Sequence, residues 1–466
     1  MNLFDQVAAA RIQDAIEPGE LRDLPGPNSF PASLTSLDLC EHPLRCELDR
    51  EFHARPFERL ETPRLISHLA LLSGAGAEAI ERDRAHIARL CAHYGVALPA
   101  SGAVHLSVDF GPFRLKWERH SEFSAYTLIR PVAAGERWFA APPIELLPRS
   151  WRADLVGELL IATHLVLWLE SDPPVTAEAL RPLFSVSNLN GCQVADGAAM
   201  VWSDFRIHPD GFTRILILDR GLRATQAGRL VQRLLNIETY RLMAMLAFPL
   251  ARQVGGEITR IEGQLADLTW RMNQNAGLEQ DHALLAELSG LAADMERITA
   301  STTYRFGASR AYYDLVERRI AELREIRVPG VQTLQEFADR RLAPAMRTVR
   351  SVGERQDLLS ARIARAANLL RTYVDVALEQ QNRDLLRSMD RRADLQLRLQ
   401  ETVEGLSVVV LSYYLVGLVS YAVKALSKLG LPLNPDLAAG LAIPVVLAVV
   451  GLGMRRLRRR LAHCEG

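Results

Sequence analysis

Two long apolar segments near the C-terminal end of the chain limit what it can fold into. Gly405–Val423 and Leu437–Met454 contain no formally charged side chain. Each has about 18 or 19 residues, which at ~1.5 Å per residue gives a helix of ~28 Å, close to the thickness of a bilayer's hydrocarbon core. Pro432 and Pro435 lie between them and favour a turn, because a proline ring cannot continue a helix. The sequence therefore predicts a transmembrane hairpin within residues 401–466, with spans at 405–423 and 437–454.

Basic residues flank the predicted hairpin on one side. Arginines precede the first span and follow the second, whereas the connecting loop offers only Lys424 and Lys428. By the positive-inside rule, both ends of the hairpin and everything before it are expected in the cytoplasm. The alternative is a pair of buried helices in a soluble domain, in which an arginine cluster beside such an aliphatic run is unusual. The arginines are Arg383, Arg387, Arg391, Arg392 and Arg398 before the hairpin, and Arg455, Arg456, Arg458, Arg459 and Arg460 after it.

Composition narrows the remaining classes of protein. The chain has 466 residues, enough for two or three domains, and a formal net charge of zero gives no reason to expect nucleic acid as a partner. Its five cysteines are scattered without C-x-x-C spacing, which is typical of reduced thiols in a cytoplasmic protein. The start of the sequence lacks a basic stretch followed by an apolar core, so no cleavable signal peptide is expected and insertion would depend on the hairpin.

The part before the hairpin divides into three regions by pattern. Residues 1–40 hold several prolines and glycines and are expected to form a loosely ordered arm. Residues 41–223 mix short apolar runs with an amphipathic helix at Ala77–Tyr94. Asn190-Gly191 and Asp210-Gly211 are turn signals typical of β-hairpins, whose strands pair antiparallel. We therefore expect a cytoplasmic α+β head domain with a mostly antiparallel sheet.

Residues 224–400 carry helical patterns and no further strand signals, and we expect a helical stalk there. A regular apolar spacing of four and three residues runs along its last helix, as in a coiled coil. A helix this long needs partners, which are either the preceding helices folding back or other copies of the chain. The sequence therefore predicts a homo-oligomer joined through the stalk. The positions of the seam are Leu359, Ile363, Ala366, Leu370, Tyr373 and Ala377.

Catalytic motifs with a strong mechanism are missing from the sequence, since it contains no P-loop, no H-E-x-x-H and no G-x-S-x-G. Glu51 and His53, and likewise Glu118, His120 and Glu122, alternate with other residues and would share a face of an extended backbone. If the two clusters converge, they form a candidate metal site or acid–base pair. The alternative interpretation is surface salt bridging, or a histidine fixed by a neighbouring carboxylate.

The first predicted span has a polar side. Tyr413, Gly417, Ser420 (or Tyr421) and Lys424 follow helical spacing. Small and hydroxylated residues let membrane helices pack closely, which is the first interpretation. The second is that the same residues line a pore in an oligomer.

Four segments of the sequence carry a resemblance to a known family. They are EHPLRCELDREFHARPFERL (Glu41–Leu60), KWERHSEFSAYTL (Lys116–Leu128), YRFGASRAYYDLV (Tyr304–Val316) and LQLRLQETVEGLSVVVLSYY (Leu395–Tyr414). These segments resemble a bacterial family of predicted membrane-anchored proteins, domain of unknown function 3422. The resemblance covers nearly the whole chain, and its last segment is the most specific. It implies a bacterial inner-membrane protein and supplies no catalytic residue, substrate or cofactor.

The expected layout is also similar to CorA-type magnesium channels, which carry a head, long helices and a C-terminal hairpin. That family's Gly-Met-Asn signature after the first span is absent, because the corresponding region here is Lys424–Gly430. The similarity is therefore one of architecture, and architecture does not carry function.

The sequence favours a structural or scaffolding membrane protein of the inner membrane, with both termini in the cytoplasm. Its expected partners are the lipid bilayer, further copies of the chain and an unidentified cytoplasmic partner, and no cofactor is identified. One alternative is an oligomeric CorA-like ion channel or transporter. Another is a head-domain hydrolase or metal-dependent enzyme that uses Glu51, His53, Glu118 and His120.

Overall fold

The structure is a computed structural model, and the chain forms two compact units within it. The first unit holds the chain up to Leu246 together with Ala308–Met346, and the second holds Ala247–Gly307 and the chain from Arg347 onward. The division at 40, 223 and 400 stays a prediction, and the predicted arm at 1–40 lies outside the described residues. The structure describes residues 42–45, 48–49, 52, 57–100, 102–133, 135–170, 175–176, 178–185, 188–274, 278–427 and 435–462.

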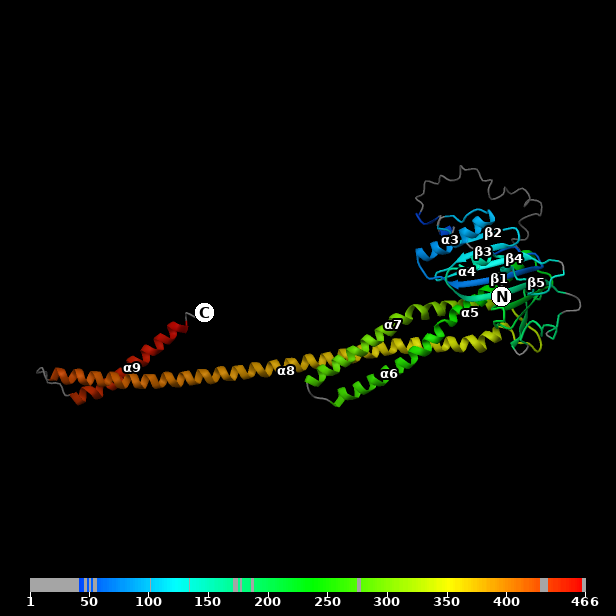
Figure 1. Ribbon diagram of the computed structural model, residues 1–466. Helices are drawn as coiled ribbons and strands as arrows, with labels where there is room; N and C mark the ends of the chain where they lie inside the picture. Colours follow the sequence, from blue (N-terminus) through cyan, green and yellow to red (C-terminus); the bar gives the residue numbers. More distant parts are fainter. Residues whose placement is uncertain are drawn as a thin grey trace, which may run out of the picture. The chain divides into compact units, whose positions relative to one another are not determined.

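A nine-stranded sheet is the framework of the first unit (Figure 1). The strand order is β2-β3-β4-β1-β5-β8-β7-β6-β9. Neighbouring strands pair antiparallel except β5 and β8, which are parallel. The sheet is therefore mixed, with the antiparallel majority that the sequence predicts. The strands are β1 (Arg64–Leu72), β2 (His105–Asp109), β3 (Arg114–Arg119), β4 (Phe123–Pro131), β5 (Glu158–Leu169), β6 (Asn190–Val194), β7 (Ala199–Ser203), β8 (Thr213–Asp219) and β9 (Ile326–Arg327).

Some helices lie between the strands in the sequence, and the long helices follow β8. Helix α3 has the bounds that its amphipathic pattern predicts, and it ends at Gly95, whose left-handed conformation a side chain would disfavour. The predicted long C-terminal helix is present as α8. The helices are α3 (Ala77–Tyr94), the 3-10 turn η3 (Pro143–Leu146), α4 (Arg149–Ala153), α5 (Ala224–Met245), α6 (Ala247–Gln274), α7 (Leu278–Ala321), α8 (Leu334–Ser427) and α9 (Pro435–Ala462).

Strand β1 lies near the middle of the sheet and is covered on both faces. It pairs with β4 on one side and β5 on the other. Alternate side chains enter different apolar clusters, since Leu69 and Leu71 pack with α3, whereas Ala70 packs with α5. A strand that is covered on both faces is expected to be apolar at nearly every position, because neither face meets water. The sequence of β1, RLISHLALL, is mostly apolar in this way.

The β6–β7 hairpin shows why one sequence-based turn prediction is wrong. Asn190-Gly191 is not a turn, because it opens β6, and the chain reverses at Ala195 and Asp196, both of which have positive φ. Gly191 pairs with Trp202 across the hairpin, and a Cβ there would lie 2.4 Å from a carbon of the indole ring. The glycine therefore makes room for Trp202 and provides no turn.

The Asp210-Gly211 signal is in a turn, as predicted, and β7 and β8 pair antiparallel on either side of it. Gly211 has a φ of 83°, and Asp210 Oδ1 accepts a hydrogen bond of 3.0 Å from the backbone N–H of Phe212. The connection is longer than the two-residue turn that the sequence suggests, because it begins right after Ser203 and ends before Thr213.

The chain that leads into β1 crosses α5 at a very short distance. The backbone N–H of Leu60 donates a 3.0 Å hydrogen bond to the carbonyl of Ala224, in the first turn of α5. One turn later, a Cβ built on Gly228 would lie 1.6 Å from the carbonyl oxygen of Glu58. Only glycine at position 228 permits this crossing, and the crossing fixes the segment Phe57–Leu60 against the helix.

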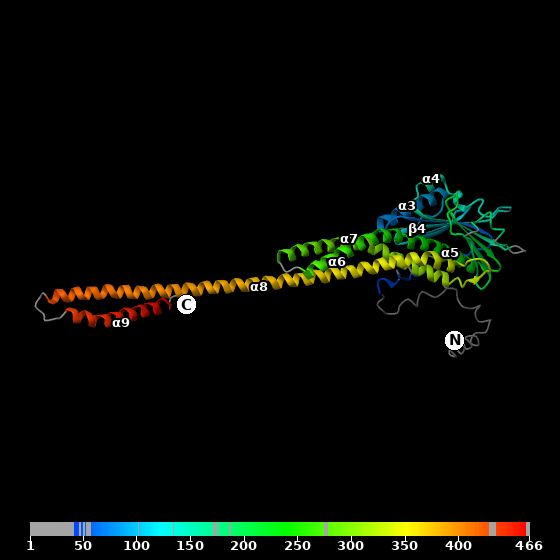
Figure 2. The ribbon, with the colours of Figure 1, turned by 90° about the horizontal axis from the view of Figure 1, so that it is seen from below.

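In the second unit, α6, the first part of α7 and the middle of α8 pack side by side (Figure 2). Apolar residues such as Ile261 of α6, Leu288 of α7 and Leu359 of α8 are fully buried. Polar contacts also join the helices, since Thr302 Oγ1 of α7 donates a 3.0 Å hydrogen bond to Gln356 of α8, and α6 and α8 share the ion pair between Glu262 and Arg355.

The predicted seam on α8 is partly correct. Leu359, Ile363 and Leu370 are buried as expected, but Tyr373 is 62% exposed and Val374 is buried in its place. The reason is that a straight helix has 3.6 residues per turn, so a strict repeat of 3.5 drifts off the buried face.

The predicted two-helix hairpin is not shown by the structure, although both helices that would form it are present. Helix α8 is the one helix among the described residues that is long and apolar enough to cross a membrane. The second predicted span lies within α9, where the structure describes only some of the side chains.

The close crossing at Gly228 predicts a large effect of a single methyl group. Gly228→Ala should destabilise the first unit by about 2 kcal/mol or more, because the methyl group overlaps a backbone carbonyl that cannot move freely. Gly263→Ala in α6 is the control, since a Cβ there has nothing within 4 Å and the substitution gains helix propensity. Denaturant unfolding of the detergent-solubilised chain measures both. Equal stability of the two variants would contradict the close crossing.

Candidate functional site

The structure describes three of the five candidate residues that the sequence places together: Glu118, His120 and Glu122. Glu51 and His53 lie outside the described residues, so their convergence with the second cluster stays a prediction. Glu118 is on β3, whereas His120 and Glu122 lie in the turn between β3 and β4. The strand alternation that would put these three side chains on one face therefore does not extend past Arg119.

Each described member of the second cluster has its own surroundings. The carboxylate of Glu118 lies 3.0 Å from the Lys116 ammonium, and both side chains are largely buried. The ring of His120 stacks on Phe123, with ring centroids 4.3 Å apart. Glu122 is 6% exposed. Within the described part of the chain, no group of three or more His, Cys, Asp or Glu side chains has a geometry that could hold a metal ion.

Glu118 and Lys116 line a small cavity beneath α5, together with apolar residues such as Ile129 and Leu235. The cavity has a volume of about 30 Å³, and His68 and Thr127 also line it. A space of this size holds one water molecule and excludes an organic substrate. This arrangement suits a buried structural site and does not suit a catalytic centre.

His68 joins three elements of the first unit. Its Nδ1 is 2.9 Å from Thr127 Oγ1 on β4, and its Nε2 is 3.1 Å from Thr239 Oγ1 on α5. Burial, and then the charge of Lys116, lowers the pKa of His68 to about 4. The imidazole is therefore neutral at pH 7, and it acts as both donor and acceptor between two hydroxyl groups.

A second buried polar cluster lies on the opposite face of the sheet, under α3. Asp83 and Arg119 form an ion pair of 3.2 Å and are 0% and 2% exposed. Ser73 and Ser124 donate hydrogen bonds of 2.8 and 2.5 Å to Asp83 Oδ2, and Arg119 also donates to the carbonyl of Gly74. Removing one partner would leave a buried charge uncompensated, so this pair holds α3 in place on the sheet.

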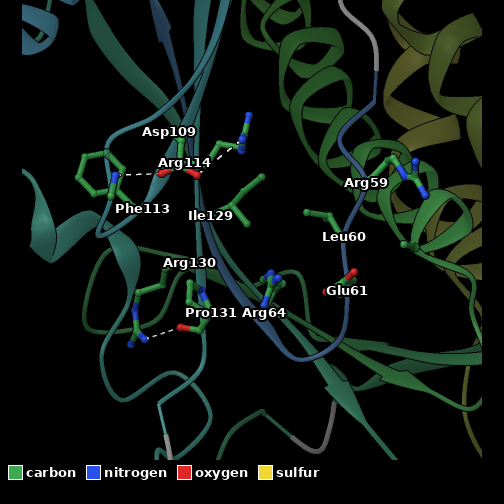
Figure 3. Close-up of a pocket in the computed structure, with 12 residues that line it drawn as sticks. Arg59, Leu60, Glu61, Arg64, Asp109, Phe113, Arg114, Ile129, Arg130 and Pro131 are labelled. Atoms are coloured by element: carbon green, nitrogen blue, oxygen red, sulfur yellow. Dashed lines mark hydrogen bonds and ion pairs between the residues drawn. The ribbon is translucent and has the colours of Figure 1, made fainter. Parts of the chain in front are cut away.

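A larger cleft lies at the end of the sheet where β1 begins, and its volume is about 390 Å³. Figure 3 shows the segment Arg59–Arg64 on one side of it and strands β3 and β4 on the other. A volume of this size is in the range of small-ligand sites. We call it the arginine cleft. Its lining residues are Arg59, Leu60, Glu61, Arg64, Asp109, Gly111, Phe113, Arg114, Ile129, Arg130, Pro131 and Ala224.

Two of the cleft's arginines are held by carboxylates. Arg130 donates to both oxygens of Glu136, at 2.9 and 2.6 Å. Arg114 lies 3.6 Å from Asp109 and 3.7 Å from Glu58. Arg64 differs, because its hydrogen bond goes to the carbonyl of Pro63, at 3.1 Å, and no described carboxylate is within ion-pairing distance of it.

The sequence gives no local signal for the arginine cleft. Its residues come from the segment before β1, from the four strands β1 to β4, from the turn between β2 and β3, and from the start of α5, and they are spread over positions 59–224. Only the pairing of β1 with β4, which places Arg64 opposite Pro131, brings them together.

The predicted packing or pore residues of the first span lie near the end of α8. Tyr413 is 77% exposed, and an added Cβ at Gly417 would meet nothing within 4 Å. Ser420 is half-buried and Lys424 is exposed. These four residues stay predictions for packing or for a pore.

Comparison with protein families gives one match. A family model described as "Protein of unknown function (DUF3422)" matches residues 40–461. No curated protein and no solved structure matches the chain. The family match extends over both compact units, including the apolar end of α8.

The buried neutral histidine predicts a pH-dependent stability. Because the pKa of His68 is about 4 in the folded chain and 6.5 when exposed, the unfolded chain binds the proton first as the pH falls. Its contribution is fully present above about pH 6.5 and should decline by about 2 kcal/mol on acidification to about pH 4.5. Denaturant unfolding at several pH values measures this slope.

His68→Asn should flatten that slope, whereas His93→Asn, which changes an exposed side chain, should leave it unchanged. A slope that is the same in the wild type and in both variants would contradict the assignment. His86 and His164 also have their pKa lowered to about 4, mainly by burial, so part of the slope remains in His68→Asn.

Proposed function

We propose a function for a chain that belongs to the DUF3422 family of proteins of unknown function: it anchors a cytoplasmic α+β domain to a bacterial inner membrane, where it acts as a scaffold or binds a partner. The observation that carries the proposal is the surface of α8 near its end. Only 6% of the most apolar 18-residue segment of this helix is buried. Val409, Leu411 and Leu418 are each more than half exposed.

This apolar surface is costly in water. Exposed apolar area costs roughly 25 cal/mol per Å², so a whole turn of exposed Val and Leu costs several kcal/mol unless something covers it. Exposed apolar side chains on more than one side of a helix suit lipid better than one partner protein, since a protein interface covers one side. The length of Gly405–Val423 also fits the hydrocarbon core.

Helix α9 is the proposed second span. Leu441, Val445, Val449 and Leu452 are exposed along it, as in the last part of α8. Pro444 lies inside the helix, and membrane helices tolerate proline when neighbouring groups satisfy the freed carbonyl. With arginines on both outer sides of the pair, the positive-inside rule favours a cytoplasmic location for the sheet domain and for both termini.

We also propose that the chain self-associates through α8. Beyond Val374, the described side chains of α8 are mostly exposed, so α6 and α7 no longer cover it. A stripe with four-three spacing includes Leu385 and Met389 there, is interrupted by the polar Arg392 and Gln396, and resumes at Leu399 and Val403. It reaches Leu406, Val410 and Tyr413, so one helix face could join copies both outside and inside the bilayer. The channel and enzyme alternatives have no comparable support.

Membrane anchoring predicts a simple fractionation result. The full chain should remain in the membrane pellet after alkaline extraction, and a fluorescent reporter fused after Gly466 should fluoresce in the cytoplasm. Val410→Asp together with Leu418→Asp should release a large part of the protein, because each carboxylate costs about 2.5–3.5 kcal/mol at the centre of a membrane helix. Leu397→Asp, outside the span, is the control.

Two results would contradict anchoring: a wild-type chain in the soluble fraction without detergent, or a reporter after Gly466 that is exposed on the periplasmic side. Quantitative blotting of both fractions decides the first. Paired fluorescent and phosphatase reporters decide the second.

Self-association predicts a position-specific effect on α8. Leu385→Asp and Leu399→Asp lie on the stripe and should convert the detergent-solubilised oligomer into monomers. Leu397→Asp, which changes an equally exposed leucine on another side of the helix, should not. Size-exclusion chromatography with light scattering measures the mass. A monomeric wild type, or equal dissociation by all three substitutions, would rule out this interface.

A further inference from the structure

We propose that the arginine cleft binds a small organic oxyanion, a carboxylate or phosphate attached to an apolar body, with Arg64 as its main charge partner. This inference concerns the first unit alone and does not depend on membrane anchoring.

Arg64 is the first reason. It begins β1 and is half-buried, and its hydrogen bond is to the carbonyl of its own neighbour Pro63. Among the described residues it has no carboxylate within ion-pairing distance, although a partly desolvated guanidinium is most stable beside an anion. Figure 3 shows Arg64 between Pro131 and Glu61, next to the open space of the cleft. An added oxyanion would complete its pairing.

The second reason is that the cleft's other strand arginines are already fixed in place. Bidentate pairing with Glu136, together with a 2.5 Å hydrogen bond to the carbonyl of Ala141, fixes Arg130. Arg114 is held by Asp109 and Glu58. Because these side chains are ordered in advance, a ligand would spend little conformational entropy in reaching them. Their charges are compensated, which leaves Arg64 as the cation that needs a ligand.

The third reason is the apolar lining beside the charge. Leu60, Phe113 and Ile129 are 4%, 1% and 6% exposed and form part of the wall. Figure 3 shows Leu60 and Ile129 pointing towards each other across the cleft. A site with a half-buried cation that lacks a described carboxylate partner, beside an apolar wall, favours a ligand with a charged group and an apolar body over an inorganic ion.

The start of α5 adds to the positive potential, because Ala224, its first residue, also lines the cleft. A helix N-terminus carries a partial positive charge that favours anions. Glu61 is the opposing group, but it is exposed, so solvent screens its charge. The balance of charges at Arg64 therefore favours a ligand with a single oxyanion group.

Calorimetric titration of the full-length chain in detergent tests the proposal. The probes are phenyl phosphate and benzoate, which share an apolar ring and carry different oxyanions, and benzyl alcohol as the neutral analogue. We expect saturable binding of at least one anion and none of benzyl alcohol. Binding of neither anion at millimolar concentration, or equal binding of benzyl alcohol, would overturn the proposal.

Variants then locate the site. Arg64→Gln should lower the affinity for the bound anion by about tenfold, since the charge-assisted pair between the guanidinium and the oxyanion is lost. The affinity of Arg64→Lys should lie between those of the wild type and Arg64→Gln, because an ammonium group keeps the charge but lacks the planar two-donor geometry of a guanidinium. Arg181→Gln, which removes a 60% exposed arginine from the surface pair with Glu178, is the matched control. Wild-type affinity in Arg64→Gln would refute the site.

Two further measurements show whether the variant is folded and whether the phosphate belongs to a lipid or to a soluble molecule. Thermal unfolding shows whether Arg64→Gln is folded, and if it is not, the affinity of Arg64→Lys decides the outcome in its place. Dihexanoyl phosphatidic acid, added in competition with phenyl phosphate, separates a lipid headgroup from a soluble phosphate. Competition assigns the phosphate to a lipid, and its absence assigns it to a soluble molecule, so both results are consistent with an oxyanion site.

Discussion

The pairing of β1 with β4 and β5 is the interaction on which the first unit depends. With its two neighbours, β1 hydrogen-bonds along both edges, and the side chains of its two faces enter different cores. His68 adds a polar connection on the α5 face, where it joins Thr127 of β4 to Thr239 of α5. A displaced β1 would therefore break the apolar packing and the buried hydrogen bonds together.

The same strand determines what chemistry the unit can offer. Where β1 is covered by α5, both ring nitrogens of His68 lie within hydrogen-bonding distance of threonine hydroxyls, and the cavity beside it holds no more than a water molecule. Where β1 begins, at Arg64, the cover ends and the arginine cleft opens. The start of the strand is thus the place proposed for binding, because the half-buried Arg64 meets the open space of the cleft there.

Periodicity made much of the fold predictable. The amphipathic pattern of Ala77–Tyr94 gives the bounds of α3, because burial selects apolar residues at helical intervals. The prediction of a turn at Asn190-Gly191 was wrong, because a glycine needed for a turn and a glycine needed to make room for Trp202 cannot be told apart in a sequence. The expectation that Glu118, His120 and Glu122 share a face required an extended backbone through all three, and β3 ends at Arg119.

The arginine cleft marks where prediction from one sequence stops. Its residues share no spacing, and the register Arg64 opposite Pro131 appears only when the sheet is assembled. The apolar end of α8 is the opposite case, since its composition alone indicates lipid and its exposure agrees. A surface defined by composition can thus be found in a sequence. A site defined by tertiary register cannot, because strands of equal hydrophobicity permit several pairings that each bring different side chains together.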